Sequence, residues 1–414
     1  MGGGLLQLVA YGAQDVYLTG NPQITFFKVV YRRHTNFAIE SIQQTFNGVS
    51  SYGSQISVTV SRNGDLINRA YLQVNVPKLM ETSSSLGSEA RYVNYYGLRL
   101  LKDVVVEIGG QQIDKHYSDW MYIWNELSLP MGKKDGYEKM VGANGADLTV
   151  GTDKTMLYIP LEFWFCRNVG LALPLIALQY HEVKFKIQFD TADHCIINSS
   201  AATDLNSTLD ASMWIDYIFL DTDERRRFAQ LSHEYLIEQL QFTGQENLSS
   251  GGNNRYKLNF NHPCKELVWV AKNSGHSWYN YTSKDNVKTD TDTNVVTHEN
   301  LDGQNPVTNC LLQLNGNDRF AVRQGSYFNY VQPYQHHTNI PSNRGINVYS
   351  FALKPEEHQP SGTLNMSRID TAVLSMETQS NYLSAGQSGT LNIYAVNYNV
   401  LRIMSGMGGL AYSN

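Results

Sequence analysis

Apolar and polar residues alternate with a period of two in both halves of the chain. The clearest runs are 56–61, 72–76, 104–108 and 183–189 in the first half, and 312–315 and 391–395 in the second. Each run places its apolar side chains on one face of an extended strand and its polar side chains on the other. One face therefore meets a core and the other a polar surface, which is the pattern of antiparallel sandwiches.

Helical periodicity is scarce, and the clearest case is residues 117–127. Ser118 stands near the start of this segment, where it can cap a helix. Its apolar residues form one stripe, made of Tyr117, Trp120, Met121, Trp124 and Leu127. We therefore expect a helix packed against the rim of a sandwich.

Three long stretches lack any periodicity and are rich in Ser, Gly, Asn, Asp and Thr. They span residues 78–97, 130–153 and 272–309. We expect them to be loops, and loops of this length are usually functional or exposed.

The two halves of the chain open with the same pattern of residues. A basic cluster, an Ile-Glu-x-aliphatic-Gln segment and a Phe-x-Gly turn occur at 31–33, 39–43 and 46–48, and again at 225–227, 237–241 and 242–244. A second match joins 106–111 to 312–317, each a strand that ends in a tight polar turn. A repeat of about 200 residues is too long for a solenoid and indicates two fused copies of one domain. Such a duplication favours assembly over catalysis.

The repeat also sets the expected domain boundaries. Residues 1–23 are glycine-rich and weakly patterned, so they are predicted to be an N-terminal arm. The first domain is expected at 24–220, the second at 221–404, and a flexible tail at 405–414. Flexible ends on a rigid body commonly fold onto neighbours in assemblies.

Composition agrees with a large globular protein that forms interfaces. The chain has 414 residues, of which 42% are hydrophobic, so two or three domains with ample core are expected. Only 17% are charged, below the roughly 25% of an average soluble protein, whereas tyrosine occurs 26 times. Tyrosine suits packed interfaces because it offers a large contact area and a polar tip. The net charge of −6 argues against direct binding of nucleic acid.

Targeting signals and cysteine usage point to synthesis in a reducing compartment. The four cysteines, Cys166, Cys195, Cys264 and Cys310, are widely spaced, and free thiols are expected. No apolar run approaches the roughly 18 residues of a membrane helix. The N-terminus lacks the basic flank of a signal peptide, and Leu6 stands where a myristoylation motif has Ser or Thr. We expect a soluble protein made in the cytosol.

Motifs for metals, cofactors and catalysis are weak. Asp290, Asp292 and Asn294 imitate the opening of a calcium loop, but Val295 and Leu301 stand where that loop has Gly and Glu. No histidines have H-x-x-H or H-E-x-x-H spacing; His336 and His337 are adjacent, and a strand would point them to opposite faces. The compact triplet 193–195 (Asp-His-Cys) is placed in a loop. No nucleophile elbow, phosphate loop or dinucleotide fingerprint occurs. We therefore predict no catalytic residue, no metal and no cofactor.

An arginine cluster and a set of glycosylation sequons each allow more than one interpretation. The cluster Arg225-Arg226-Arg227 can bind a phosphate or pair with Asp221, Asp223 and Glu224, and pairing is favoured. Five N-x-[ST] sequons provide glycosylation candidates at Asn198, Asn206, Asn247, Asn280 and Asn365. Ordinary secretory glycosylation is disfavoured because the chain lacks a signal peptide.

Several segments resemble a known family of viral proteins. These are residues 8–23 (LVAYGAQDVYLTGNPQ), 170–178 (GLALPLIAL), 216–220 (DYIFL) and 399–410 (NVLRIMSGMGGL). Together they resemble the major capsid proteins of nucleocytoplasmic large DNA viruses, which are icosahedral, and the likeness is closest to the chlorovirus (algal virus) members. The segments lie at both ends and in the middle, so the resemblance covers nearly the whole chain.

The resemblance implies an all-β fold of two consecutive eight-stranded antiparallel jelly rolls (a double jelly roll) with short helices in loops. It also implies a structural, non-enzymatic role in trimeric pseudo-hexagonal capsomers that tile the outer shell of the virion. The implied partners are two further copies of the chain, neighbouring capsomers and minor capsid proteins beneath the shell. Direct contact with nucleic acid is not expected, and contact with the internal membrane is expected to be indirect. Synthesis in the host cytoplasm and glycosylation by virus-linked machinery complete this expectation.

The N-terminal arm is expected to bind beneath the capsomer or against its neighbours. The candidate assembly residues in this arm are Leu8, Tyr11, Asp15, Tyr17 and Asn21. Three alternatives remain: a jelly-roll carbohydrate- or receptor-binding module, a paralogous capsid variant at a special shell position, and a sandwich-fold glycosidase. The last requires two carboxylates about 5–10 Å apart in an open groove.

Overall fold

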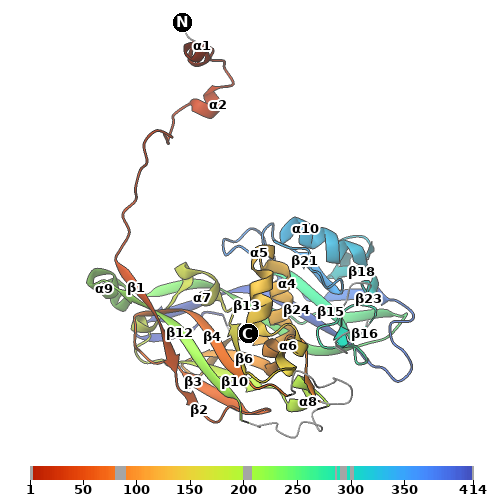
Figure 1. The fold of residues 1–414 in the computed structure, drawn as a ribbon. Coiled ribbons are helices and arrows are strands. Elements are labelled where there is room, and N and C mark those ends of the chain that lie inside the picture. Colours follow the sequence, from red (N-terminus) through yellow and green to blue (C-terminus); the bar gives the residue numbers. More distant parts are fainter. Residues whose placement is uncertain are drawn as a thin grey trace. The chain divides into compact units, whose positions relative to one another are not determined.

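A computed structural model of the chain describes residues 3–79, 90–198, 208–284, 287–289, 296–298 and 303–412, with the backbone alone at 287–289 and 296–298. The chain divides into two units, Met1–Asn36 and Phe37–Asn414 (Figure 1). The first unit holds two short helices, α1 (Gly3–Val9) and α2 (Val16–Thr19), and neither buries a residue. The sequence placed the end of the arm at residue 23, whereas the body begins at Phe37, where the first strand starts.

The first half of the body is a sandwich of two antiparallel sheets. One sheet has the strand order β1-β12-β4-β8 and the other β2-β3-β10-β6-β7. The strands are β1 (Phe37–Gln44), β2 (Phe46–Asn47), β3 (Gln55–Thr59), β4 (Leu66–Val76), β6 (Leu101–Ile108), β7 (Gln111–Tyr117), β8 (Thr155–Pro160), β10 (Val183–Phe189) and β12 (Asp210–Leu220). Short strands β5 (Arg91–Tyr92), β9 (Leu173–Pro174) and β11 (Ile196–Ile197) lie in its loops.

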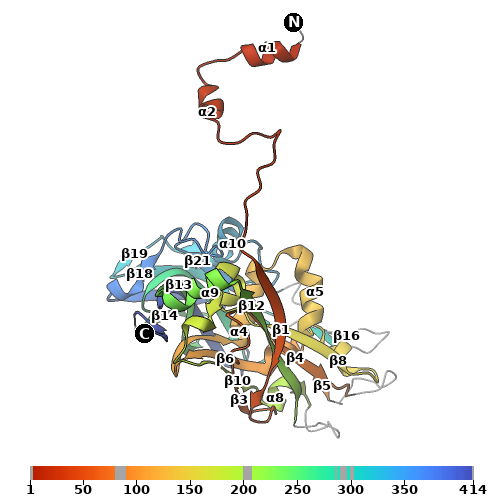
Figure 2. The same cartoon turned by 90° about the vertical axis from the view of Figure 1, so that its left-hand side faces the viewer.

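The second half repeats this topology strand for strand. Its sheets have the orders β13-β24-β15-β21 and β14-β23-β18-β19, so first, last and intermediate strands occupy the same positions as in the first half. The strands are β13 (His233–Leu248), β14 (Asn253–Lys257), β15 (Pro263–Asn273), β18 (Val307–Leu314), β19 (Asn317–Asp318), β21 (Ile346–Ser350), β23 (Ala372–Thr378) and β24 (Gly389–Met404). The two sandwiches lie side by side (Figures 1 and 2). This arrangement confirms the predicted all-β double jelly roll.

The same tight turn closes one hairpin in each half. Gly109 and Gly110 join β6 to β7 with φ of 60° and 83°, and Asn315 and Gly316 join β18 to β19 with φ of 49° and 80°. Two consecutive positive φ values define the type I′ turn, which matches the twist of antiparallel strands and favours Gly and Asn. The sequence match between 106–111 and 312–317 is therefore confirmed as an equivalent hairpin.

The alternating runs bury one face, as predicted. In β10, for example, Val183, Phe185, Ile187 and Phe189 are buried and the intervening residues are half-buried. Each half has its own apolar core, and that of the second half is built around Trp269, Phe328 and Leu374. Burying side chains of this size stabilises the fold by roughly 1.5–3 kcal/mol each.

Several short helices cover the ends of the sheets. The helix predicted at 117–127 is confirmed as α4 (Ser118–Ser128), and all its residues except the last are buried. The others are α3 (Tyr96–Leu100), α5 (Met131–Val141), α6 (Gly145–Thr149), α7 (Trp164–Arg167), α8 (Ala192–Cys195), α9 (Thr222–Gln230), α10 (Gln332–His336), the π-helical turn η4 (Tyr327–Val331), and the 3₁₀ turns η1 (Val169–Leu171), η2 (Leu175–Ala177) and η5 (Met366–Arg368).

Helices also occupy two regions that the sequence assigned to loops. The 130–153 stretch contains α5 and α6; α5 buries only Val141, so it carries little apolar periodicity. Gly142 ends α5 with φ of 70°, and the Asn144 side chain accepts a hydrogen bond from Ala146 N at the start of α6. The triplet 193–195 lies in α8 rather than in a loop.

The C-terminal segment is a strand rather than the expected flexible tail. Strand β25 (Met407–Leu410) pairs with β24, across a turn in which Ser405 and Gly406 have φ of 52° and 80°. The loop prediction at 272–309 is also only partly correct, because it contains a small hairpin of β16 (Val287–Thr289) and β17 (Val296–His298). The calcium-like residues 290–294 lie outside the described residues.

Candidate functional site: the junction and the uncovered faces

The sheet β13-β24-β15-β21 is buried on both of its faces. One face, with Trp269 and Ile393, packs into the core of the second half. The opposite face, with Val268, Val396 and Tyr394, joins the core cluster of the first half. Helix α4 lies against this face, where the rings of Trp120 and Tyr394 are 5.5 Å apart. The first half therefore covers the second half's sheet and fixes the two sandwiches together.

The equivalent sheet of the first half, β1-β12-β4-β8, has an open outer face. Trp214 pairs in register with Tyr71, and Gln73 pairs with Tyr158 on the neighbouring strand. The rings of Tyr71 and Tyr158 are 6.2 Å apart. Tyr158 and Met156 are 40% and 38% exposed, whereas the side chains that alternate with them in β8 are buried. We call Tyr71, Met156, Tyr158 and Trp214 the open aromatic face.

A second uncovered apolar surface lies on the helical segment of the second half. Helix α4 follows β7 in the first half, and η4 and α10 lie at the corresponding place, between β19 and β21, in the second. Tyr330, Val331 and Tyr334 on this segment are 38%, 38% and 76% exposed. We call these three residues the helical aromatic face. It occupies the position in the second half that α4 occupies at the internal junction.

Buried ion pairs connect the two halves. Arg167 at the end of α7 contacts Glu238 on β13 at 2.9 Å, and Lys265 on β15 contacts the same carboxylate at 2.7 Å. The Lys265 side chain is fully buried. Burial alone raises the pKa of Glu238, but Arg167, His358 and Lys265 outweigh it and lower this pKa to about 2. The junction thus depends on an ionised Glu238.

A buried histidine extends this charged region. His337 Nε2 lies 2.9 Å from Glu266, and its Nδ1 lies 2.9 Å from Glu356. Burial alone lowers the pKa of His337, but the two carboxylates outweigh it and raise this pKa to about 9. His336 ends α10 and its Nδ1 lies 3.0 Å from Leu353 O. The adjacent histidines therefore lie in different environments. They do so at the end of α10, and not in a strand that points them to opposite faces.

We expect the free energy of unfolding to fall as pH rises from about 6.5 to 9. The folded pKa of His337 is raised, so its contribution is complete below 6.5 and is lost through about 9. The loss is about 3 kcal/mol, because one pKa unit corresponds to about 1.4 kcal/mol. Urea unfolding across this range measures the slope, which His337→Gln should flatten. The control His336→Gln should keep the slope; equal slopes for all three proteins would contradict the assignment.

A second buried group joins α4 to the second half. The Asp119 carboxylate accepts hydrogen bonds from Lys272 Nζ at 2.9 and 3.0 Å and from the Tyr281 hydroxyl at 2.9 Å. Burial alone raises the pKa of Asp119, but Lys272 outweighs it and lowers this pKa. The Trp278 ring lies 5.5 Å from Lys272 Nζ and 3.9 Å from the Arg99 guanidinium.

A pocket of about 280 Å³ at the junction brings together the carboxylates of Glu238 and Glu356. A glycosidase requires one carboxyl group that stays protonated and acts as an acid. Both groups fail this requirement. Arg167 and Lys265 pair with Glu238, while His337 and Thr338 donate hydrogen bonds to Glu356 and outweigh its burial, so the pKa of each carboxylate is lowered. The lowered pKa values therefore disfavour these two carboxylates as the acid and base of a glycosidase.

The sequons occupy different environments. Asn247 and Asn365 are exposed, and Asn198 is exposed with φ of 56°. Asn280 is only 3% exposed; its Nδ2 donates to Lys284 O at 3.0 Å and its Oδ1 accepts from Thr282. A glycan on Asn280 would require this part of the fold to open. Asn206 lies outside the described residues.

The candidate arm residues belong to no core, and all of them except the half-buried Asp15 are exposed. Leu8, Tyr11 and Tyr17 are 77%, 56% and 92% exposed. Asp15 accepts a hydrogen bond from Gly12 N at 2.7 Å, and Asn21 has φ of 52°. Exposed apolar residues of this kind commonly mark an interaction site.

The sequence also led to predictions about the cysteines, the arginine cluster at 225–227, metal sites and membrane helices. All four cysteines are free thiols. Arg225 pairs with Asp65 at 2.9 Å rather than with its acidic neighbours, and Asp221 instead caps α9 by accepting from Thr222 N. Among the described residues, no group of three or more His, Cys, Asp or Glu side chains is placed to hold a metal. No helix in the described part of the chain is long and apolar enough to cross a bilayer.

The uncovered faces were missed by sequence reasoning. Tyr71 occupies an outer position of β4, whose run at 72–76 was assigned a polar outer face, and Trp214 occupies the paired position of β12. The signal was present, because aromatic residues at these outer positions indicate an interface rather than a solvated surface.

Comparisons with known proteins agree on one family. A model described as the major capsid protein N-terminus matches residues 25–221, and a model of large eukaryotic DNA virus major capsid proteins matches 224–409. The chain is 53% identical to the major capsid protein of Pyramimonas orientalis virus and 47% identical to that of Paramecium bursaria Chlorella virus 1, each over 100% of both chains.

Solved structures show the same relationship. A quasi-atomic model of the PBCV-1 virus capsid contains a chain that is 42% identical, with a TM-score of 0.81 over 94% of this chain and 100% of that one. The Faustovirus major capsid protein shares 14% identity and a TM-score of 0.72 over 95% of this chain and 94% of that one, which shows the fold alone.

Proposed function

The chain belongs to the major capsid proteins of large eukaryotic DNA viruses, and on that premise we propose that three copies form a closed ring-shaped capsomer. Its role is structural and its place is the virion capsid; the family is not enzymatic. The trimer, its contacts and its neighbours in the shell are the proposal.

The proposal of a trimer rests on one observation: the two equivalent sheets, one in each half of the chain, differ in what covers their outer faces. The sheet β13-β24-β15-β21 is covered by the first half of its own chain, while β1-β12-β4-β8 has no equivalent cover within Phe37–Asn414 as described. The second half of a neighbouring copy can cover it in the same manner. The open aromatic face of one copy then meets the helical aromatic face of the next.

This contact is heterologous, because it uses two different surfaces of the same chain. Each copy contributes two similar sandwiches, so three copies close a ring of six similar units, and such a ring packs a plane. Tyrosine at both surfaces, with Trp214 on the open aromatic face, suits a permanent interface. An obligate contact of this kind should bury about 2,000 Å² or more.

Light scattering after size-exclusion chromatography tests the trimer directly. The expected mass is three times the 46.7 kDa of one chain, and it should persist on dilution to nanomolar concentration. A stable monomer at micromolar concentration would overturn the proposal.

We further propose that the arm joins the capsomer to neighbouring capsomers or to minor capsid proteins beneath the shell. Deleting residues 1–23 should leave the protein trimeric, with a mass three times that of the shortened chain, because both proposed contact faces lie in the body. The truncated trimer should fail to form shells when co-expressed with the other capsid components, as seen by electron microscopy. The control Tyr17→Phe keeps the apolar ring and should assemble; shells of normal yield from the truncated chain would contradict this role.

Glycosylation is proposed at exposed asparagines. Asn198, Asn247 and Asn365 are open to a modifying enzyme in the folded protein, whereas Asn280 is buried. Peptide mass spectrometry of purified virions should find glycans among the first three and an unmodified Asn280. We also propose that the chain makes no direct contact with nucleic acid, which agrees with the net charge of −6. Synthesis in the host cytoplasm and only indirect contact with the internal membrane are proposed from the family alone.

A further inference from the structure

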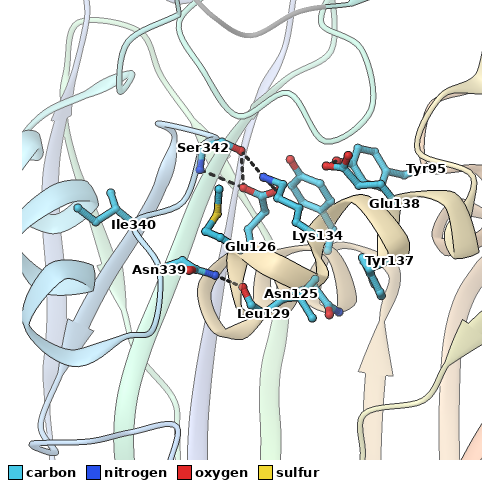
Figure 3. Close-up of a pocket in the computed structure, with 12 residues that line it drawn as sticks. Tyr95, Asn125, Glu126, Leu129, Lys134, Tyr137, Glu138, Asn339, Ile340 and Ser342 are labelled. Carbon is cyan, nitrogen blue, oxygen red and sulfur yellow. Dashed lines mark hydrogen bonds and ion pairs between the residues drawn. The ribbon is translucent and has the colours of Figure 1, made fainter.

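A small pocket lies where the end of α4, helix α5 and residues 339–342 meet. Its volume is about 80 Å³, and Figure 3 shows its lining. The lining combines the aromatic residues Tyr95, Tyr122 and Tyr137 with the charged residues Glu126, Lys134 and Glu138. None of these residues belongs to the open aromatic face or the helical aromatic face, so the pocket is independent of the proposed trimer contact.

The carboxylate of Glu126 already has an ion-pair partner and hydrogen-bond donors within the pocket. Glu126 pairs with Lys134 Nζ at 3.0 Å and accepts hydrogen bonds from Ser342 N at 3.0 Å and Ser342 Oγ at 2.6 Å (Figure 3). The Glu126 side chain is only 5% exposed, and Lys134 is the basic residue of the lining. The lysine is therefore used to neutralise Glu126.

The other carboxylate has no cationic partner. Glu138 accepts a hydrogen bond from the Tyr95 hydroxyl at 3.4 Å, and no Lys, Arg or His in the described residues lies within ion-pair distance of it. Glu138 is half-buried, so water screens its charge less than on an open surface. The lining therefore has one negative charge in excess.

The rings of Tyr95 and Tyr122 lie near this excess charge. Tyr95 and Tyr122 pack edge to face with centroids 4.9 Å apart, and Tyr122 stacks on Tyr279 at 4.7 Å. Tyr95 is held with φ of 54°, which is unusual for a bulky residue. Burial raises the pKa of Tyr95, with Glu126 and Glu138 adding to the effect, so its phenol stays neutral. Neutral aromatic rings beside a carboxylate attract cations through the ring faces.

We propose that this pocket binds an organic cation, an ammonium or guanidinium group on an alkyl stem, between Glu138 and the tyrosine rings. The volume suits such a head group but not a sugar ring. A divalent metal is disfavoured because calcium requires six to eight oxygen ligands and the free carboxylate supplies two. A lysine or arginine side chain of another protein and a free alkylamine carry the same chemistry.

Calorimetric titration of the purified protein with n-butylammonium and n-butylguanidinium at constant ionic strength tests the site. Binding should be saturable with Kd on the order of 1 mM, and n-butanol should not bind. Glu138→Gln should weaken binding at least about fivefold. Asp135→Asn makes the same charge change on the same helix at an exposed position, and it should alter Kd less than about twofold.

Further titrations separate the two sources of the cation. Nα-acetylated lysine and arginine amides that bind more tightly than the butyl cations would indicate a protein side chain; equal affinity would indicate a free amine. Glu138→Asp, which keeps the charge, should retain more affinity than Glu138→Gln and guards against a folding defect in the latter. No saturation by the wild-type protein, or equal affinity for wild type and Glu138→Gln, would overturn the proposal.

Discussion

Replacing Trp214 by alanine is expected to weaken the proposed trimer so that it dissociates into monomers on dilution. Trp214 lies beside Tyr71 on the open aromatic face, and tryptophan at the centre of an interface typically contributes 2 kcal/mol or more to association. Each ring contains three copies of this contact, and every 1.4 kcal/mol changes an equilibrium constant tenfold. Light scattering over a dilution series should therefore show the variant dissociating at a concentration about 100-fold or more above that of the wild type.

The fold of the single chain should survive this substitution. Trp214 is half-buried and its indole nitrogen donates only to Ser212 Oγ, at 3.2 Å. Tyr334→Ala on the helical aromatic face should weaken the same contact from the other side. Tyr180→Ala removes an aromatic ring that is 75% exposed but belongs to neither face, so it should leave the trimer intact. A Trp214→Ala trimer that resists dilution as well as the wild type would sink the proposed pairing of faces.

Replacing Glu238 by glutamine is expected to lower the free energy of unfolding by about 3–5 kcal/mol. The substitution leaves Arg167 and the fully buried Lys265 without their shared carboxylate. Removing one partner of a buried ion pair is costly because the remaining charge stays desolvated. Glu234→Gln is the matched control: its pair with Arg402 is more than half exposed on the glutamate side, and surface pairs contribute at most about 1 kcal/mol.

The same carboxylate predicts the acid side of the stability profile. The folded pKa of Glu238 is lowered from 4.5 to about 2, so its contribution is complete above 4.5 and is lost as pH falls through about 2. The loss should be about 3 kcal/mol. Denaturant unfolding between these pH values should show this decrease in the wild type and a flatter profile in Glu238→Gln. A Glu238→Gln protein as stable as the wild type would show that the pair is dispensable.

The sequence predicted much of the fold because alternation, helical stripes and turn residues each depend on a few neighbouring residues. The alternation in 183–189 matches the burial of β10, the stripe at 117–127 became α4, and the turn residues at 109–110 and 315–316 require the positive φ that they adopt. The repeated segments identified the duplication, which the strand order of the two halves confirms.

The errors arose where tertiary contacts replace local signals. Helix α5 buries only Val141, so its sequence lacks an apolar stripe. Strand β25 is rich in glycine and exists because β24 offers an edge; the close approach of Gly408 to Leu178 leaves no room for a side chain. Neither segment carries a pattern that distinguishes it from a loop.

The sequence by itself determined that two like sandwiches are fused and which side chains face their cores, because period-two alternation and turn residues act over a few neighbours. Only the tertiary structure decided what covers each sheet. Glu238 and Lys265 meet Arg167 across the junction, and β1-β12-β4-β8 keeps an open face while its counterpart is buried twice. These contacts join residues far apart in the chain, and their partners are set by packing between the halves rather than by any local pattern.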